Sequence, residues 1–143
     1  MKTLMLSITF CLSVFMMTAQ TATKTTIKGT TITVTVPVPG HGGSLIAGIY
    51  NEETFMKSEP LQGLESDVNE GYASVTFTNI APGTYAIALY HDKNGNKIMD
   101  FEPNGMPLEM YGVSNNPMSY GPPQWNEAKF EVGTEPITME IRL

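Results

Sequence analysis

The chain has 143 residues and a formal net charge of −6, with 14 acidic against 8 basic residues. This length is enough for one domain with a substantial hydrophobic core. The acidic balance and the lack of any basic run argue against nucleic acid or an anionic membrane surface as a partner.

The N-terminus is typical of a secretory signal peptide. Lys2 precedes an apolar run at residues 4–17, which is too short to span a membrane, and small residues follow at Thr18 and Ala19. We predict cleavage after Ala19, with Ala22 as the alternative position. The sequence therefore predicts export to the periplasm or to the outside of the cell.

The predicted domain plan follows from this leader. Residues 1–19 form the signal peptide, residues 20–28 a flexible lead-in and residues 29–143 a single domain. Loss of Lys2 leaves seven basic against 14 acidic residues, a net charge of −7, and loss of Cys11 leaves no cysteine and no disulfide. We expect a monomer stabilised by its core, with no membrane span in the mature chain.

Beyond the lead-in the apolar residues alternate with a period of two, which is the pattern of half-buried β-strands. The pattern predicts strands near residues 32–36, 45–50, 72–77, 85–90, 128–132 and 137–143, with a weaker strand at 108–113. We therefore predict an all-β fold, an antiparallel Greek-key β-sandwich of about seven strands. The predicted core includes Val34, Ile49, Val75, Phe77, Ile87, Leu89, Phe130, Met139 and Ile141.

Two segments interrupt this alternation. Residues 51–57 predict one or two helical turns, with Asn51 as the N-cap and two glutamates in the first turn. Residues 91–127 show little regular pattern. A loop of that length in a compact domain is usually functional or held in place by a ligand.

The start of the long segment has the oxygen-donor spacing of a calcium-binding loop. Side-chain oxygens occur at every second position after the predicted strand and again at positions nine and eleven. Calcium takes six to eight oxygen ligands in a forgiving geometry. The sequence therefore predicts a Ca²⁺ ion bound by the side chains of Asp92, Asn94, Asn96, Asp100 and Glu102 and by the backbone carbonyl of Ile98.

Two features leave a plain turn open as the alternative. Lys97 stands where such loops usually have Gly, so the loop needs either an unfavourable backbone at Lys97 or a different turn. Asn94-Gly95 is a strong signal for a short hairpin. Lys93 and Lys97 could also neutralise the acidic side chains without a metal.

The long segment also carries aromatic residues that could bind a ligand. Tyr111, Tyr120 and Trp125, together with Phe101, would form a stacking platform for a sugar or peptide if they were exposed side by side. In the alternative, these side chains fold inward as a small satellite core, because a long loop needs apolar anchors to hold its shape.

No catalytic motif is present in the sequence. His41 and His91 are too far apart for a zinc signature, and Ser114 and Ser119 lie in no nucleophile-elbow motif. We expect His91 to be partly buried and hydrogen-bonded to a loop backbone. The sequence therefore predicts no catalytic residues.

Four stretches, taken in their order along the chain, resemble a family of exported bacterial proteins known as a domain of unknown function. They are Pro82-Gly83-Thr84-Tyr85-Ala86, His91-Asp92 through Asp100, Gly105-Met106-Pro107-x-Glu109-x-Tyr111-Gly112-x-Ser114-Asn115, and Pro122-Pro123-x-Trp125-x-x-Ala128-x-Phe130. The resemblance implies a prealbumin-like (transthyretin-like) sandwich without an assigned activity. Members of that family usually have Gly at the position of Lys97.

Enzymes on related sandwiches are not matched. The chain ends Glu140-Ile141-Arg142-Leu143, without the Tyr-Arg-Gly-Ser end of prealbumin-like hydroxyisourate hydrolases, and it lacks the His-x-His pair of intradiol dioxygenases. We therefore expect an exported, non-enzymatic binding or interaction module with a structural calcium loop and a protein or glycan partner. The alternatives are a carbohydrate- or small-ligand-binding protein that uses the aromatic loop 101–127, and a hydrolase with an unrecognised site.

Overall fold

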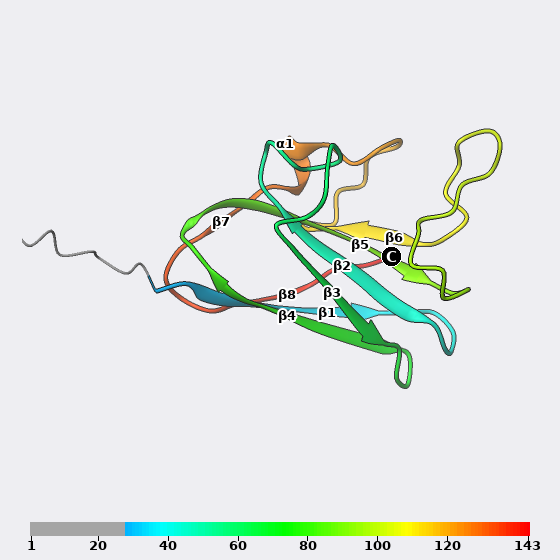
Figure 1. Cartoon of the computed structure of the whole chain (residues 1–143), viewed down its shortest axis with the longest axis horizontal. Coiled ribbons are helices and arrows are strands. Elements are labelled where there is room, and N and C mark those ends of the chain that lie inside the picture. The colour runs from blue at the N-terminus through cyan, green and yellow to red at the C-terminus, as the bar shows by residue number, and fades with distance from the viewer. Residues whose placement is uncertain (1–27) are drawn as a thin grey trace, which may run out of the picture.

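The computed structural model describes residues 28–143, so the predicted signal peptide and nearly all of the lead-in lie outside the described residues. The described chain forms two β-sheets packed face to face (Figure 1). Its elements, in order, are β1 (Thr30–Pro37), β2 (Ser44–Tyr50), β3 (Gln62–Asp67), β4 (Tyr72–Ile80), β5 (Gly83–Asp92), β6 (Tyr111–Val113), α1 (Trp125–Ala128), β7 (Phe130–Val132) and β8 (Ile137–Glu140). The predicted all-β sandwich is confirmed.

The smaller sheet has the strand order β4-β1-β8. β1 pairs antiparallel with β4, where Val34 lies opposite Val75, and it pairs parallel with β8, where Val34 lies opposite Met139. The parallel pair joins the first and last strands of the domain. Alternation within a strand carries no information on strand direction, so the sequence did not reveal this pair.

The larger sheet has the order β3-β2-β5-β6, with β7 paired to β5 as well. β2 and β5 run antiparallel, from Tyr50 opposite Ala86 to Ser44 opposite Asp92. The connections from β1 to β2 and from β4 to β5 each cross from one sheet to the other, as in a Greek-key sandwich. The register places the end of β5, where the predicted metal loop begins, beside the start of β2.

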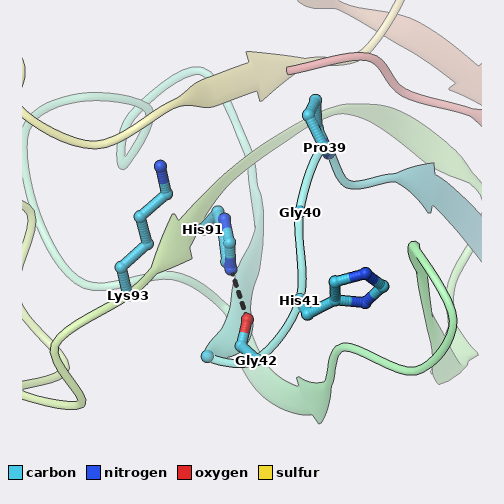
Figure 2. Close-up of a pocket in the computed structure, with 7 residues that line it drawn as sticks. Pro39, Gly40, His41, Gly42, His91 and Lys93 are labelled. Carbon is cyan, nitrogen blue, oxygen red and sulfur yellow. Dashed lines mark hydrogen bonds between the residues drawn. The ribbon is translucent and has the colours of Figure 1, made fainter.

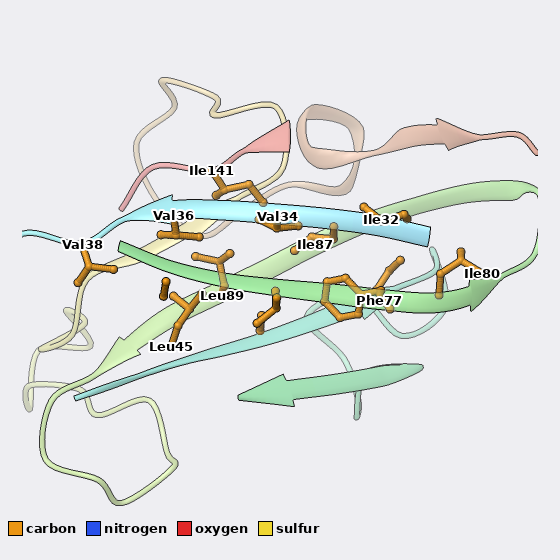
Figure 3. Close-up of a cluster of buried hydrophobic side chains, with 14 of the residues drawn as sticks. Ile32, Val34, Val36, Val38, Leu45, Phe77, Ile80, Ile87, Leu89 and Ile141 are labelled. Carbon is orange, nitrogen blue, oxygen red and sulfur yellow. The ribbon is translucent and has the colours of Figure 1, made fainter. Parts of the chain in front are cut away.

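The core fills the space between the two sheets (Figure 3). Seven of the predicted core residues are buried. Completely buried are Val34, Ile49, Phe77, Ile87 and Ile141, and nearly so are Val75 and Leu89. Phe130 and Met139 are only half-buried, which corrects the prediction for them. The reason is position: β8 is an edge strand and β7 lies off the main order of its sheet, so these side chains lack neighbours on one side.

Three local predictions are corrected by the structure. Residues 51–57 form turns and no helix, because Met56 takes a left-handed φ of 56°, although Asn51 does cap them by accepting the N–H groups of Glu53 and Thr54 at 3.1 and 3.0 Å. Only residues 111–113 of the weaker strand are extended, and Ala128 ends α1 instead of starting a strand.

β3 is the strand that the sequence did not reveal, because only one of its residues is a large apolar side chain. It is held by pairing with β2 and by one side chain at its start. The Gln62 amide donates to the carbonyl of Thr78 on β4 at 3.3 Å and accepts the N–H of Thr78 at 3.1 Å. This pair of hydrogen bonds joins an edge of each sheet.

A second, smaller core lies on the outer face of the larger sheet. Ala86 belongs to it, and because neighbours on a strand point to opposite faces, Ala86 points away from the main core that Ile87 enters. Its other buried members are Phe55, Val113 and Ala128. Across residues 28–143 no helix is long and apolar enough to cross a membrane.

Candidate metal centre

The predicted metal loop begins at the buried end of β5. Asp92 is completely buried, and its two carboxylate oxygens accept separate backbone N–H groups. Oδ1 accepts from Gly95 and Oδ2 from Lys97, each at 2.8 Å. The Asp92 carboxylate therefore folds residues 93–97 back over the end of the strand.

Two asparagines continue the same local geometry. The Oδ1 atom of Asn94 accepts the N–H of Asn96 at 3.0 Å, and the Oδ1 atom of Asn96 accepts the N–H of Ile98 at 2.9 Å. Their Nδ2 groups both donate to Oδ2 of Asp100, at 2.7 and 2.9 Å. The structure thus brings Asn94, Asn96 and Asp100 into direct contact at the mouth of the loop.

Lys97 adopts the backbone that its position in the loop demands. Its φ is 60°, in the left-handed region that favours glycine, and Gly95 has a φ of 76°. A non-glycine residue in this region costs about 1–2 kcal/mol. The hydrogen bond from the Lys97 N–H to buried Asp92 offsets this strain, so the loop keeps its turn without the usual glycine.

Glu109 is a further carboxylate of this centre that sequence reasoning missed. It is 7% exposed, and its two oxygens accept backbone N–H groups from both ends of the loop. Oε1 accepts from Lys93 at 3.2 Å and Oε2 from Asp100 at 3.4 Å. The backbone N–H of His91 donates to the carbonyl of Met110 at 2.9 Å, and this contact holds the neighbouring Glu109 beside the loop. Sequence spacing alone does not show it.

The predicted ligand Glu102 lies elsewhere. It is exposed, its carboxylate accepts from the Asn104 amide at 3.1 Å, and its N–H donates to the carbonyl of Met106 at 2.8 Å. These contacts belong to a tight hairpin that closes with the bridge between Phe101 and Pro107. Glu109, and not Glu102, therefore supplies the additional carboxylate that touches the loop backbone.

The ion pairs found in residues 28–143 do not include the loop carboxylates Asp92, Asp100 and Glu109. Lys97 turns its side chain out of the loop, and its Nζ atom forms an ion pair with Glu65 on β3 at 2.7 Å. The second ion pair found in residues 28–143 lies near the C-terminus. The acidic side chains Asp92, Asp100 and Glu109 therefore lie close to one backbone turn, and none of them forms an ion pair within residues 28–143.

The negative potential of this cluster reaches the strand beneath it. Burial is the largest cause that raises the pKa of Tyr90 above its ordinary value of 10.0, and the charges of Asp92 and Glu109 raise this pKa further, with a smaller contribution from Asp100. Partial burial of the phenol and the nearby carboxylates both disfavour the phenolate. Tyr90 is therefore a reporter of the charge in the loop.

The carboxylates alone do not form a metal cage. Within residues 28–143 no three His, Cys, Asp or Glu side chains are grouped so as to hold a metal ion. A bound cation would have to draw on amide and backbone oxygens as well. The Oδ1 atoms of Asn94 and Asn96 each accept one backbone N–H and have a second lone pair, and amide oxygens are donors that calcium accepts.

The aromatic residues proposed as a ligand platform are separated in the structure. Trp125 is half-buried and packs on Phe55 with ring centroids 5.8 Å apart, as part of the smaller core. Tyr120 is fully exposed, whereas half-buried Tyr111 lines a hollow of about 430 Å³ beside Arg142. The close aromatic pairs in the described part of the chain do not include Tyr111 or Tyr120.

His91 and Ser114 have structural hydrogen bonds. The prediction that His91 bonds to a loop backbone is confirmed, since its Nε2 lies 2.8 Å from the carbonyl oxygen of Gly42 (Figure 2). Ser114 is completely buried; its hydroxyl accepts the N–H of Ile87 at 3.0 Å and donates to the carbonyl of Ala128 at 2.5 Å. Ser114 therefore ties β5 to the end of α1.

A family comparison adds one finding to this geometry. The model of a bacterial family, described as "Uncharacterized protein conserved in bacteria (DUF2141)", matches residues 32–140. The chain belongs to this family. The matched region of this DUF2141 protein contains both sheets of the sandwich and the whole loop from Asp92 to Glu109. No curated protein and no solved structure matches the chain.

Proposed function

We propose that this DUF2141 protein is an exported, non-enzymatic binding or interaction module with a prealbumin-like sandwich, and that a calcium ion orders its loop at residues 92–109. The leader sequence supports export, and the two-sheet architecture supports the prealbumin-like assignment. We propose no catalytic role because the sequence holds no catalytic motif and because the hydroxyl of Ser114 is buried and donates to the carbonyl of Ala128.

One observation carries the calcium proposal: carboxylates converge on one turn, and within residues 28–143 none of them forms an ion pair. Asp92 is completely buried and Glu109 is nearly so, and Asp100 is half-buried. Buried charge is costly unless it is paired or coordinates a metal. Backbone N–H groups compensate part of this charge, and a divalent cation would compensate the rest.

The proposed ligands are the side-chain oxygens of Asn94, Asn96 and Asp100, the carbonyl of Ile98, and the carboxylates of Asp92 and Glu109. This set has the mixed carboxylate, amide and carbonyl composition that calcium takes in proteins. The ion would fix the start of the long segment, and through Glu109 it would also fix the start of β6. The segment would then hold its shape for a partner.

Thermal unfolding of metal-stripped protein tests the proposal. A ligand at a hundredfold excess over its dissociation constant adds about 2.7 kcal/mol to the free energy of unfolding. For a domain of this size that is a rise in melting temperature of about 10 °C. We expect calcium to produce this rise and a chelator to reverse it, with a parallel change in the fluorescence of Trp125, the only tryptophan.

Variants of the loop separate an ion site from a plain turn. Asp100→Ala should abolish the calcium response, whereas Lys93→Ala, which removes an exposed cation, should leave it intact. Lys97→Gly should bind calcium more tightly, because glycine takes the left-handed φ at little cost. An unchanged melting temperature and unchanged Trp125 emission across millimolar calcium would instead support the plain Asn-Gly turn.

A further inference from the structure

A second possible site lies next to the metal loop, at the turn between β1 and β2. A hollow of about 410 Å³ opens there, and it is lined by Pro39, Gly40, His41, Gly42, Gly43, His91 and Lys93. Both histidines of the chain and one lysine are in this lining, and no carboxylate is. The lining therefore carries one formal positive charge, from Lys93, and no formal negative charge.

The backbone of this turn offers unused donors. Gly40, Gly42 and Gly43 have φ values of 105°, 77° and 79°, so the turn follows a left-handed path that other residues rarely take. Within residues 28–143 the N–H groups of residues 40–43 donate to no protein acceptor. Free N–H groups of successive residues in such turns form concavities that bind anions.

His91 fixes this turn in place. Its Nε2–H donates to the carbonyl of Gly42, because a carbonyl oxygen can only accept. A Cβ at Gly43 would lie 2.7 Å from Nε2 and 2.5 Å from the carbonyl oxygen of Asp92, so only glycine allows the turn to approach this closely. His91 is 1% exposed and its Nδ1 atom has no partner within the described residues.

Lys93 supplies the formal charge. Its side chain is exposed and lines the hollow, and Figure 2 shows it on the opposite side of His91 from His41. Only its backbone N–H, which donates to Glu109, takes part in the metal centre. The Lys93 ammonium is therefore available to a ligand that the metal loop does not use.

We propose that the β1–β2 turn and Lys93 form a binding site for a small oxyanion, of the carboxylate or phosphate class. The Lys93 ammonium and the free N–H groups of residues 40–43 would donate to the anion, and His91 would act as a positioning residue for the turn. The site does not depend on calcium binding.

Amide NMR of metal-stripped protein tests this proposal, with sodium acetate and inorganic phosphate titrated separately at constant pH and ionic strength. We expect saturable shifts confined to the amides of residues 40–43 and 91–93. Tighter saturation by one anion would identify the preferred class. Lys93→Gln should weaken binding about tenfold or more, because a hydrogen bond to a charged group is worth about 1.5–3 kcal/mol. Lys57→Gln is the matched control, since Lys57 bonds to the Glu52 carbonyl far from this turn, and it should change nothing.

Three results would overturn the proposal. The first is no saturable shift with either anion. The second is binding of equal strength in the protein and in Lys93→Gln. The third is a response to Zn²⁺ at His41 and His91 without any response to anions, which would assign the hollow to a transition metal. Because Lys93→Gln leaves the loop ligands in place, failure here is distinguishable from failure of the calcium proposal.

Discussion

Replacement of Asp92 measures how much the hydrogen bonds of the metal loop contribute to the free energy of unfolding, apart from any contribution of a bound ion. The Asp92 carboxylate accepts two backbone N–H groups, from Gly95 and Lys97, at 2.8 Å each, and it has no solvent contact. Each hydrogen bond to a charged group contributes about 1.5–3 kcal/mol. Asp92→Ala should therefore lower the free energy of unfolding by about 3–6 kcal/mol in metal-free buffer.

Asp92→Asn should lose about half of that amount, because the amide keeps one acceptor oxygen and turns a donor toward the second N–H group. Domains of this kind have total stabilities of about 5–15 kcal/mol, so Asp92→Ala approaches the limit of folding while Asp92→Asn stays folded. Thr33→Val is the control: it removes one neutral, exposed hydrogen bond, between the hydroxyls of Thr33 and Thr76, outside the loop and should cost about 0.5–1.5 kcal/mol.

Urea unfolding followed by circular dichroism measures these losses, provided that the slope of the transition is unchanged. With saturating calcium the gap between the natural protein and Asp92→Ala should widen, because only the natural loop gains the ion. A loss below about 1 kcal/mol for Asp92→Ala would refute the account of the loop, since two charged hydrogen bonds cannot contribute so little.

Three further results are expected. Ser114→Ala should cost about 1–3 kcal/mol in urea unfolding, because the buried N–H of Ile87 loses its acceptor; a neutral result would show that the strand does not need this hydroxyl. Calcium should lower the raised pKa of Tyr90 toward 10.0 in an NMR titration, because the ion neutralises the nearby carboxylates, whereas a pKa unmoved by calcium would place the ion elsewhere. Lys97→Gln should raise the lowered pKa of Glu65 toward its ordinary value of 4.5. The ion pair stabilises the protein above that pH, and this stabilisation is lost as the pH falls through the lowered pKa. An identical Glu65 titration in the natural protein and in Lys97→Gln would contradict the ion pair.

The central strands could be predicted from sequence because one face of each strand is buried and the other is more exposed. In β4 every second side chain from Ala73 to Phe77 is buried, so the period of two is visible in the residue types themselves. β3 is different, since Leu64 is its only large apolar residue and its stability comes from pairing with β2 and from the Gln62 contact to Thr78. Such a strand is stabilised by contacts with residues distant in the sequence, and the sequence of the strand itself does not show these contacts.

The candidate metal centre was likewise predicted only in part. The spacing from Asp92 to Asp100 is local, so the sequence shows it, and even the strained backbone at Lys97 follows from the missing glycine. Glu109 comes to the loop through the return of the chain toward β6, which no local pattern encodes. The Gly-rich turn at residues 40–43 is visible in the sequence, but its contact with His91 is not, because that contact arises from the pairing of β2 with β5.

Isothermal titration calorimetry of calcium into the metal-stripped protein measures whether the loop at residues 92–109 binds an ion. We predict saturable binding of one ion per chain, strong loss of binding in Asp100→Ala and in Glu109→Gln, and unchanged binding in Lys93→Ala. The absence of saturable heat up to millimolar calcium, or equal binding by the natural protein and Asp100→Ala, would contradict the account of loop 92–109 as a calcium centre.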